Sequence, residues 1–254
     1  MQTRRFWPRS WPLILLLCAC DGESFSEEVF IDQAIDLDGV STVFFETDVG
    51  LDIQGSRGNE VTLLATIELT TSSTESLQLA RQAFGLEAER EGSSLLLRLE
   101  APGGIGFDFE QARLSGVLEV GLPRDVDVDA RVIGGGIRAL DMESDLVLRA
   151  AGPVNADPAQ GDATISAGSG GAFVRALLSS GRDVRVQVNA GNLELVLPRG
   201  LSARVRAESR AGSIVLDHPE LPLLPSGRPY DATIGRGGAD VQALTLRGDI
   251  LLRD

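Results

Sequence analysis

The chain has 254 residues, a formal net charge of -14 at pH 7, one histidine, two cysteines and no lysine. This acidity makes nucleic acid and bare anionic membranes poor partners, because both carry charge of the same sign. The missing lysine excludes a lysine Schiff base and a P-loop lysine as sources of chemistry.

Residues 1–19 have the layout of a secretory signal. Three arginines lie among the first nine residues, an apolar run leads to Ala19, and no acidic residue precedes Asp21. The run is shorter than the roughly 20 apolar residues that span a bilayer. We expect this segment to be removed on export, which takes away three arginines and lowers the net charge from -14 to -17.

Both cysteines lie at the end of this segment, in the sequence Leu17-Cys18-Ala19-Cys20. These four residues resemble the bacterial lipobox, and the resemblance implies that Cys20 becomes the first residue of the mature protein and carries a lipid. Cys18 fits this role less well, because Leu17 before it is larger than the cleavage site usually accepts. The alternatives are an ordinary secretion signal with incidental cysteines and a zinc site, for which the single distant His218 adds too few ligands.

Residues 20–28 are predicted to form the lipidated cysteine and a short acidic tether, because the apolar pattern begins only at Val29. Residues 29–254 then form an all-β domain. Apolar residues at every second position predict half-buried strands in five clear segments. These segments are 60–68, 94–100, 126–132, 183–188 and 193–197.

One helix is predicted between Ser72 and Gly85. Ser72 and Glu75 have the spacing of a capping box, and apolar residues from Leu77 to Phe84 follow at helical intervals. We expect this short helix to cap or flank the sheet at the N-terminal end of the domain.

Phe107 and Phe109 lie in an irregular, glycine-rich stretch, residues 101–113. Two aromatic side chains in a loop are a candidate contact patch for a partner. The alternative is that both rings fold back and cap the end of the domain.

Asp125, Asp127 and Asp129 alternate along one predicted strand, so their carboxylates share a face at a spacing of about 6.5 to 7 Å. They are candidate calcium ligands, but calcium takes six to eight oxygens at close range. An extended strand spreads its acids too far for one ion unless a neighbouring segment adds ligands. The favoured interpretation is therefore a solvated acidic face with no metal, and no cofactor is predicted.

An internal repeat favours a solenoid over a β-sandwich or a barrel. Residues 116–124 match residues 191–199, and each copy is followed about 20 residues later by a second glycine-led strand, at Gly136 and Gly212. A unit with two strands and two turns suits one coil of a β-solenoid. The glycine runs 134–136 and 168–171 are interpreted as turns between coils, because neither has the context of a phosphate loop.

The strand-rich start, the helix near residue 75, the motifs GNLELVLPRG and AGSIVLD, and the closing IGRGGADVQALTLRGDILLRD resemble the uncharacterised bacterial adhesin-like domain family. This family is related to an autotransporter adhesin head domain. The resemblance covers most of residues 29–254 and implies a right-handed β-solenoid or closely related stacked-sheet fold, often secreted or lipidated. It brings no agreed catalytic residues, and residues 101–113 depart from its commoner pattern.

Three functions are compatible with these features. The favoured one is a non-enzymatic, lipid-anchored protein of the bacterial cell envelope whose solenoid binds or scaffolds an envelope protein or glycan. The second is an envelope-sensing or regulatory module that acts through a protein partner. The third is a polysaccharide-active enzyme, which a groove lined by aspartate and arginine would favour. No serine–histidine pair has a recognisable spacing, and His218 is predicted to lie in a surface loop.

Overall fold

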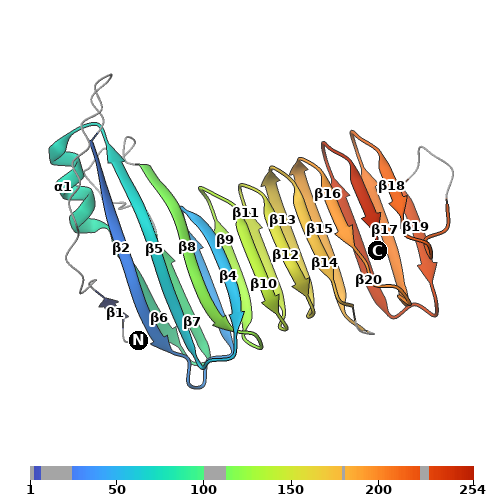
Figure 1. Ribbon diagram of the computed structural model, residues 1–254, viewed down its shortest axis with the longest axis horizontal. Helices are drawn as coiled ribbons and strands as arrows, with labels where there is room; N and C mark the ends of the chain where they lie inside the picture. Colours follow the sequence, from blue (N-terminus) through green and yellow to red (C-terminus); the bar gives the residue numbers. More distant parts are fainter. Residues whose placement is uncertain (1–2, 7–24, 100–112, 179–180, 224–228) are drawn as a thin grey trace.

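The computed structural model describes residues 3–6, 25–99, 113–178, 181–223 and 229–254. They form two long β-sheets with one short helix at the N-terminal end (Figure 1). Most strands pair in parallel, and most turns carry the chain from one sheet to the other. This is the stacked-coil architecture of a β-solenoid, as the repeat and the alternation predict. Within the described residues, no helix has the length and apolar character needed to cross a membrane.

Eleven of the described strands form sheet A, and ten form sheet B. In spatial order, sheet A contains β1 (Thr3–Phe6), β6 (Leu86–Glu91), β7 (Ser94–Leu99), β3 (Thr42–Thr47), β9 (Asp127–Val132), β11 (Leu146–Ala150), β13 (Ala163–Ser169), β15 (Asp183–Ala190), β20 (Ala239–Thr245), β17 (Ala203–Ser209) and β19 (Tyr230–Ile234). Sheet B contains β18 (Ile214–Asp217), β21 (Ile250–Arg253), β16 (Leu193–Val196), β14 (Ala172–Ala176), β12 (Val154–Ala159), β10 (Ile137–Met142), β4 (Gly50–Ser56), β8 (Arg113–Pro123), β5 (Glu60–Thr71) and β2 (Phe25–Asp36).

The central coils repeat with the predicted period of about 20 residues. Strands β9, β11, β13 and β15 of sheet A begin at residues 127, 146, 163 and 183, and one strand of sheet B lies between each pair in the chain. Inward-facing residues of successive strands stack in register, as Ile137 does on Val154 in sheet B, and both are buried. Removal of these apolar side chains from water is the main force that holds the coils together.

The coils at both ends do not stack in the order of the sequence. The C-terminal pair β20–β21 lies between the β15–β16 coil and the β17–β18 coil. At the other end, β3–β4 lies between β7–β8 and β9–β10. The last strands of the chain are therefore paired on both sides, and Val241 and Leu252 within them are fully buried.

At the N-terminal end, β2 begins at Phe25, four residues before the apolar pattern starts at Val29. Helix α1 (Thr74–Ala83) confirms the predicted helix, but its N-cap is Ser73, whose hydroxyl accepts the backbone N–H of Ser76 at 3.0 Å. The expected cap at Ser72 was wrong by one residue, because β5 continues to Thr71 and the chain needs two residues to turn into the helix.

A row of aspartates links successive coils at the ends where the sheet A strands begin. The Oδ1 atom of Asp127 accepts a hydrogen bond from the backbone N–H of Asp145 at 3.0 Å. Asp145, Asp162 and Asp183 repeat this contact with the N–H groups of Asp162, Asp183 and Asp240, at 2.9, 2.9 and 3.1 Å. Each carboxylate thus satisfies a backbone donor at the start of the next strand. We call these five residues the aspartate ladder.

Loss of one rung of this ladder should destabilise the stack. Asp162→Ala is expected to lower the free energy of unfolding by about 1 to 2 kcal/mol, because the N–H of Asp183 loses its acceptor. Asp162→Asn keeps an Oδ1 acceptor and should lose less than about half as much. Urea unfolding followed by far-UV circular dichroism measures both variants. Equal losses in the two variants would show that the hydrogen bond to the Asp183 N–H does not account for the loss.

The β20–β21 coil is inserted between the β15–β16 and β17–β18 coils. Two of its carboxyls, on Asp240 and Asp249, have pKa values below the usual 3.8. The pKa of Asp249 is lowered because its Oδ1 atom accepts hydrogen bonds from the backbone N–H and the hydroxyl of Ser213, at 2.7 and 2.9 Å. Burial acts to raise the pKa of Asp240, but hydrogen bonds from Gln242 at 2.6 Å and Arg206 at 2.5 Å outweigh it, and the net shift is downward.

These shifts predict that acid loosens the C-terminal coils first. A carboxyl whose pKa is lower in the folded than in the unfolded state stabilises the fold above its unfolded value, about 3.9, and loses that contribution as the pH falls through the folded value. We expect amide hydrogen exchange, corrected for its intrinsic pH dependence, to rise below about pH 4 in β17, β18, β20 and β21 before it rises in β9 to β14. Simultaneous loosening of both regions would contradict this prediction.

Candidate binding surface

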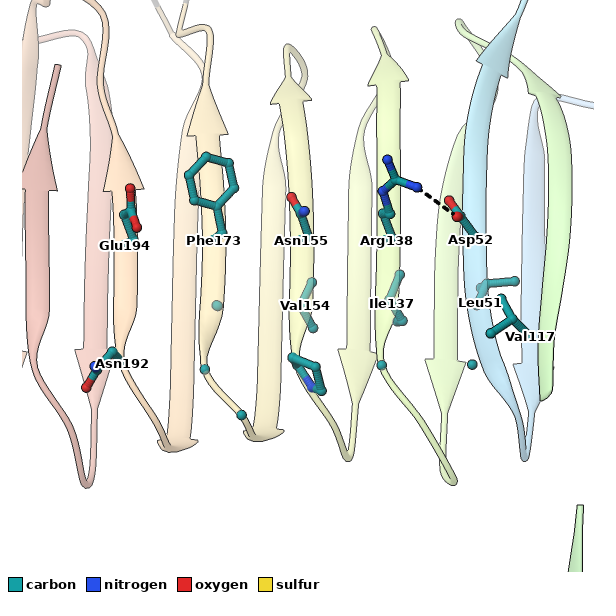
Figure 2. A pocket seen from close by; sticks show the side chains of 16 residues that line it. Leu51, Asp52, Val117, Ile137, Arg138, Val154, Asn155, Phe173, Asn192 and Glu194 are labelled. Atoms are coloured by element: carbon teal, nitrogen blue, oxygen red, sulfur yellow. Dashed lines mark hydrogen bonds and ion pairs between the residues drawn. The ribbon is translucent and has the colours of Figure 1, made fainter. Parts of the chain in front are cut away.

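The outer face of sheet B carries a groove of about 540 Å³ that runs across the strands (Figure 2). Its lining comes from six neighbouring strands, β8, β4, β10, β12, β14 and β16, and from the turns that precede them. Adjacent strands lie about 4.8 Å apart, so five strand intervals give the groove a length of about 24 Å. The groove is therefore long enough for an extended ligand.

One wall of the groove is a row of outward-facing side chains, one from each successive strand: Asp52, Arg138, Asn155, Phe173 and Glu194 (Figure 2). Their backbones pair in register from strand to strand. Arg138 donates to the Oδ2 atom of Asp52 at 3.1 Å, and Glu194 accepts from Arg253 on β21 at 2.5 Å. The wall thus offers two ion-paired carboxylates, an amide and an aromatic ring in a line.

Three glycines and a proline form the floor beside this wall. Gly50, Gly136, Pro153 and Gly171 each stand two positions before a wall residue on β4, β10, β12 and β14. A Cβ atom on Gly136 would lie 2.5 Å from the carbonyl oxygen of Pro153, which is closer than atoms can approach. The coils can stack at this distance because Gly136 and Gly171 have no Cβ atom. The same lack of side chains opens the groove.

Both glycine runs, 134–136 and 168–171, lie where the chain crosses from sheet A to sheet B, and Gly168 still belongs to the end of β13. Their interpretation as turns is confirmed, but each turn joins the two strands of one coil, β9 to β10 and β13 to β14, and not two successive coils.

A methyl group on this floor should push the coils apart. Gly136→Ala is expected to lower the free energy of unfolding by about 1 to 3 kcal/mol, because its Cβ displaces the Pro153 carbonyl. Gly85→Ala is the matched control, because a Cβ at Gly85 meets no atom within 4 Å, and it should be neutral or slightly stabilising. Thermal unfolding compares the two variants. A Gly136→Ala protein as stable as the control would show that the coil spacing can relax.

The three aspartates considered as calcium ligands have separate environments. Asp127 belongs to the aspartate ladder, the Oδ1 atom of Asp129 accepts from Arg149 at 2.6 Å, and Asp125 is exposed in the turn before β9. In the part of the chain that the structure describes, no group of three or more His, Cys, Asp or Glu side chains is placed to hold a metal ion.

Cys20, Phe107 and Phe109 lie outside the described residues, so the lipidation site and the aromatic contact patch stay predictions. Within the predicted signal segment, the structure describes residues 3–6, which form strand β1 and pair with β6 in the uncleaved chain.

His218 does not lie in a surface loop as predicted, since only 5% of its surface is exposed. Its Nδ1 atom accepts the backbone N–H of Glu220 at 3.2 Å. The prediction was wrong because the chain after β18 folds back over the end of the core, where Leu221 and Tyr230 are also buried. A proline-rich sequence indicates a connection, but it does not show which surface that connection covers.

Sequence reasoning missed the groove, although a weak signal is present. Three strands of sheet B begin with the same short pattern: a glycine, then an inward apolar residue, then an outward wall residue. The three examples are Gly50-Leu51-Asp52, Gly136-Ile137-Arg138 and Gly171-Ala172-Phe173. Such triplets mark a groove only when the strands that carry them are known to be neighbours in register.

Comparisons with known proteins do not assign this chain to a family. No family model matches the chain, and no curated protein matches it in sequence. A proposed cell adhesion protein of Clostridium sporogenes aligns over 91% of this chain and 99% of its own, at 11% identity and a TM-score of 0.48.

Two further solved structures are similar over most of their length. A proposed adhesin of Bacteroides fragilis aligns over 88% of this chain and 97% of its own, at 8% identity and a TM-score of 0.28. A proposed adhesin of Parabacteroides merdae aligns over 92% and 98%, at 10% identity and a TM-score of 0.22. Identities and TM-scores this low assign no role to this chain. A proposal for its role must come from its own surface.

Proposed function

We propose that this protein is a non-enzymatic, lipid-anchored protein of the bacterial envelope whose solenoid presents sheet B as a binding or scaffolding surface. The groove across six strands carries this proposal, because parallel pairing holds its wall residues in a fixed line. A surface that is rigid before binding loses little conformational entropy when a ligand attaches.

The anchor is proposed from the lipobox-like sequence that ends at Cys20. Strand β2 begins at Phe25, so the linking residues reach at most about 18 Å when fully extended. A lipid on Cys20 would therefore hold the N-terminal end of the solenoid close to the membrane. The strands that line the groove and the C-terminal coils lie beyond β2 and β5 along the long axis (Figure 1), so they would extend away from that end toward the surrounding envelope.

A polysaccharide-active enzyme is the second candidate, and one observation favours it. Asp52 and Glu119 occupy paired positions on β4 and β8, beside Arg138, and carboxyls about 5 Å apart are typical of retaining glycosidases. However, Asp52 is already ion-paired with Arg138, and Glu119 is exposed. A general acid needs burial to keep its proton at neutral pH. The binding function therefore ranks first.

Removal of the lipidation site should change where the protein is found. Cys20→Ser is expected to move most of the protein from the membrane to the soluble fraction, because no thioether can form. Cys18→Ser is the matched control and should stay with the membrane. Cell fractionation with immunoblotting measures both, and far-UV circular dichroism checks that both variants fold. A Cys20→Ser protein that remains at the membrane would refute the proposed anchor.

A further inference from the structure

The groove is matched to a ligand that is linear and repeats along its length. A ligand that lies in it crosses β8, β4, β10, β12, β14 and β16 in turn and meets a new strand about every 4.8 Å. This step is comparable to the length of one hexopyranose unit in a chain of linked sugars. Successive sugar units could therefore meet equivalent positions on successive strands.

A peptide cannot bind in this groove by pairing with sheet B as a further strand. Strands β4, β10, β12, β14 and β16 each pair with a neighbour on both sides. An extended peptide binds a sheet mainly through the free backbone groups of an edge strand, and these strands have no free edge. Recognition in the groove must therefore come from side chains.

The side chains of the wall suit a ligand rich in hydroxyl groups. The side-chain amide of Asn155 can donate to a ligand hydroxyl, and its Oδ1 atom is buried without a hydrogen-bond partner within the described residues. Glu194 adds carboxylate oxygens that can accept from hydroxyls. Phe173, between them in the row, is partly exposed and offers a ring against which the apolar face of a sugar can pack (Figure 2).

Charge narrows the choice of ligand further. Both wall carboxylates are ion-paired, Asp52 with Arg138 at 3.1 Å and Glu194 with Arg253 at 2.5 Å. The whole chain has a net charge of -14. The wall therefore has no net charge to attract an anionic polymer, and the acidic protein around it repels one.

We propose that the sheet B groove binds a neutral, linear glycan. In this complex Phe173 packs against one sugar ring, and Asn155 and Glu194 hydrogen-bond the hydroxyls of adjacent units. This inference rests on the proposed function, since it names the ligand class of the same surface. It differs from the proposed anchor in that it depends on the fold and not on Cys20.

Calorimetric titration of the full-length protein in detergent micelles tests the inference. The probes are chitotetraose, cellotetraose and maltotetraose, which are neutral, and tetragalacturonate, which is anionic. We expect at least one neutral tetrasaccharide to bind with a Kd on the order of 1 mM or lower, and tetragalacturonate to bind more weakly. Phe173→Ala should weaken the binding at least about fivefold.

Phe44→Ala is the matched control, because Phe44 is 36% exposed on the outer face of sheet A, and binding should be unchanged. If Phe173→Ala fails to fold by circular dichroism, Phe173→Leu removes the ring and keeps most of the bulk. The inference is overturned if no neutral probe binds at about 5 mM, if tetragalacturonate binds most tightly, or if the Phe173 and Phe44 variants bind alike.

Two further outcomes separate this inference from the proposed function. Chromatography of the probes after incubation shows whether they are cut, and shortened products would refute the non-enzymatic role while supporting glycan binding. A photo-crosslinking residue in place of Phe173 that captures a protein in intact cells, with no glycan attached, would refute the glycan and support a binding surface. Release of the Cys20→Ser variant from the membrane is independent of both results.

Discussion

Parallel hydrogen bonding between successive coils holds the strands of both sheets about 4.8 Å apart, and the rest of the structure depends on this spacing. It requires that the turns of neighbouring coils approach closely, which Gly136 and Gly171 permit because they lack a Cβ atom. It also brings the carboxylate of one aspartate within reach of the next strand's first N–H, which makes the aspartate ladder possible. The same spacing sets the interval between wall residues in the groove.

The order of the coils in space has a consequence for how the chain folds. Strands β20–β21 pair with β15–β16 on one side and with β17–β18 on the other, so the β17–β18 coil has no parallel partner until the last residues are in place. The C-terminal coils therefore depend on one another as one structural unit. Asp240 and Asp249 stabilise this unit through charge-assisted hydrogen bonds to the neighbouring coils.

The two faces of sheet B have different roles. Its inner face packs apolar side chains such as Ile137, Val154 and Leu193 against sheet A, and these determine stability. Its outer face is free to vary at alternate positions, because a strand places successive side chains on opposite sides. Asn155 and Phe173 lie on that outer face, so ligand specificity can change there without disturbing the core. A repeated scaffold can thus carry a non-repeated binding surface.

Much of the fold could be predicted from the sequence because its signals are local. Alternation within each strand, the helix beginning near Ser73 and the glycine spacing of about 20 residues are all readable within short windows. The sequence did not predict how the end of the core is covered, since the burial of His218 depends on a loop that folds back over it. The lipobox-like motif at Cys20 is likewise a local signal, and the lipid anchor is proposed from the sequence alone.

By itself, the sequence determined the all-β class, the two-strand coil and the glycine turns between strands, because each follows from the conformational preferences of neighbouring residues. Only the tertiary structure decided which strands lie side by side. Asp52 and Arg138 meet although 86 positions separate them, and Asp183 reaches Asp240 across 57 positions. The groove, the aspartate ladder and the inserted C-terminal coil all depend on such long-range register, which no local pattern encodes.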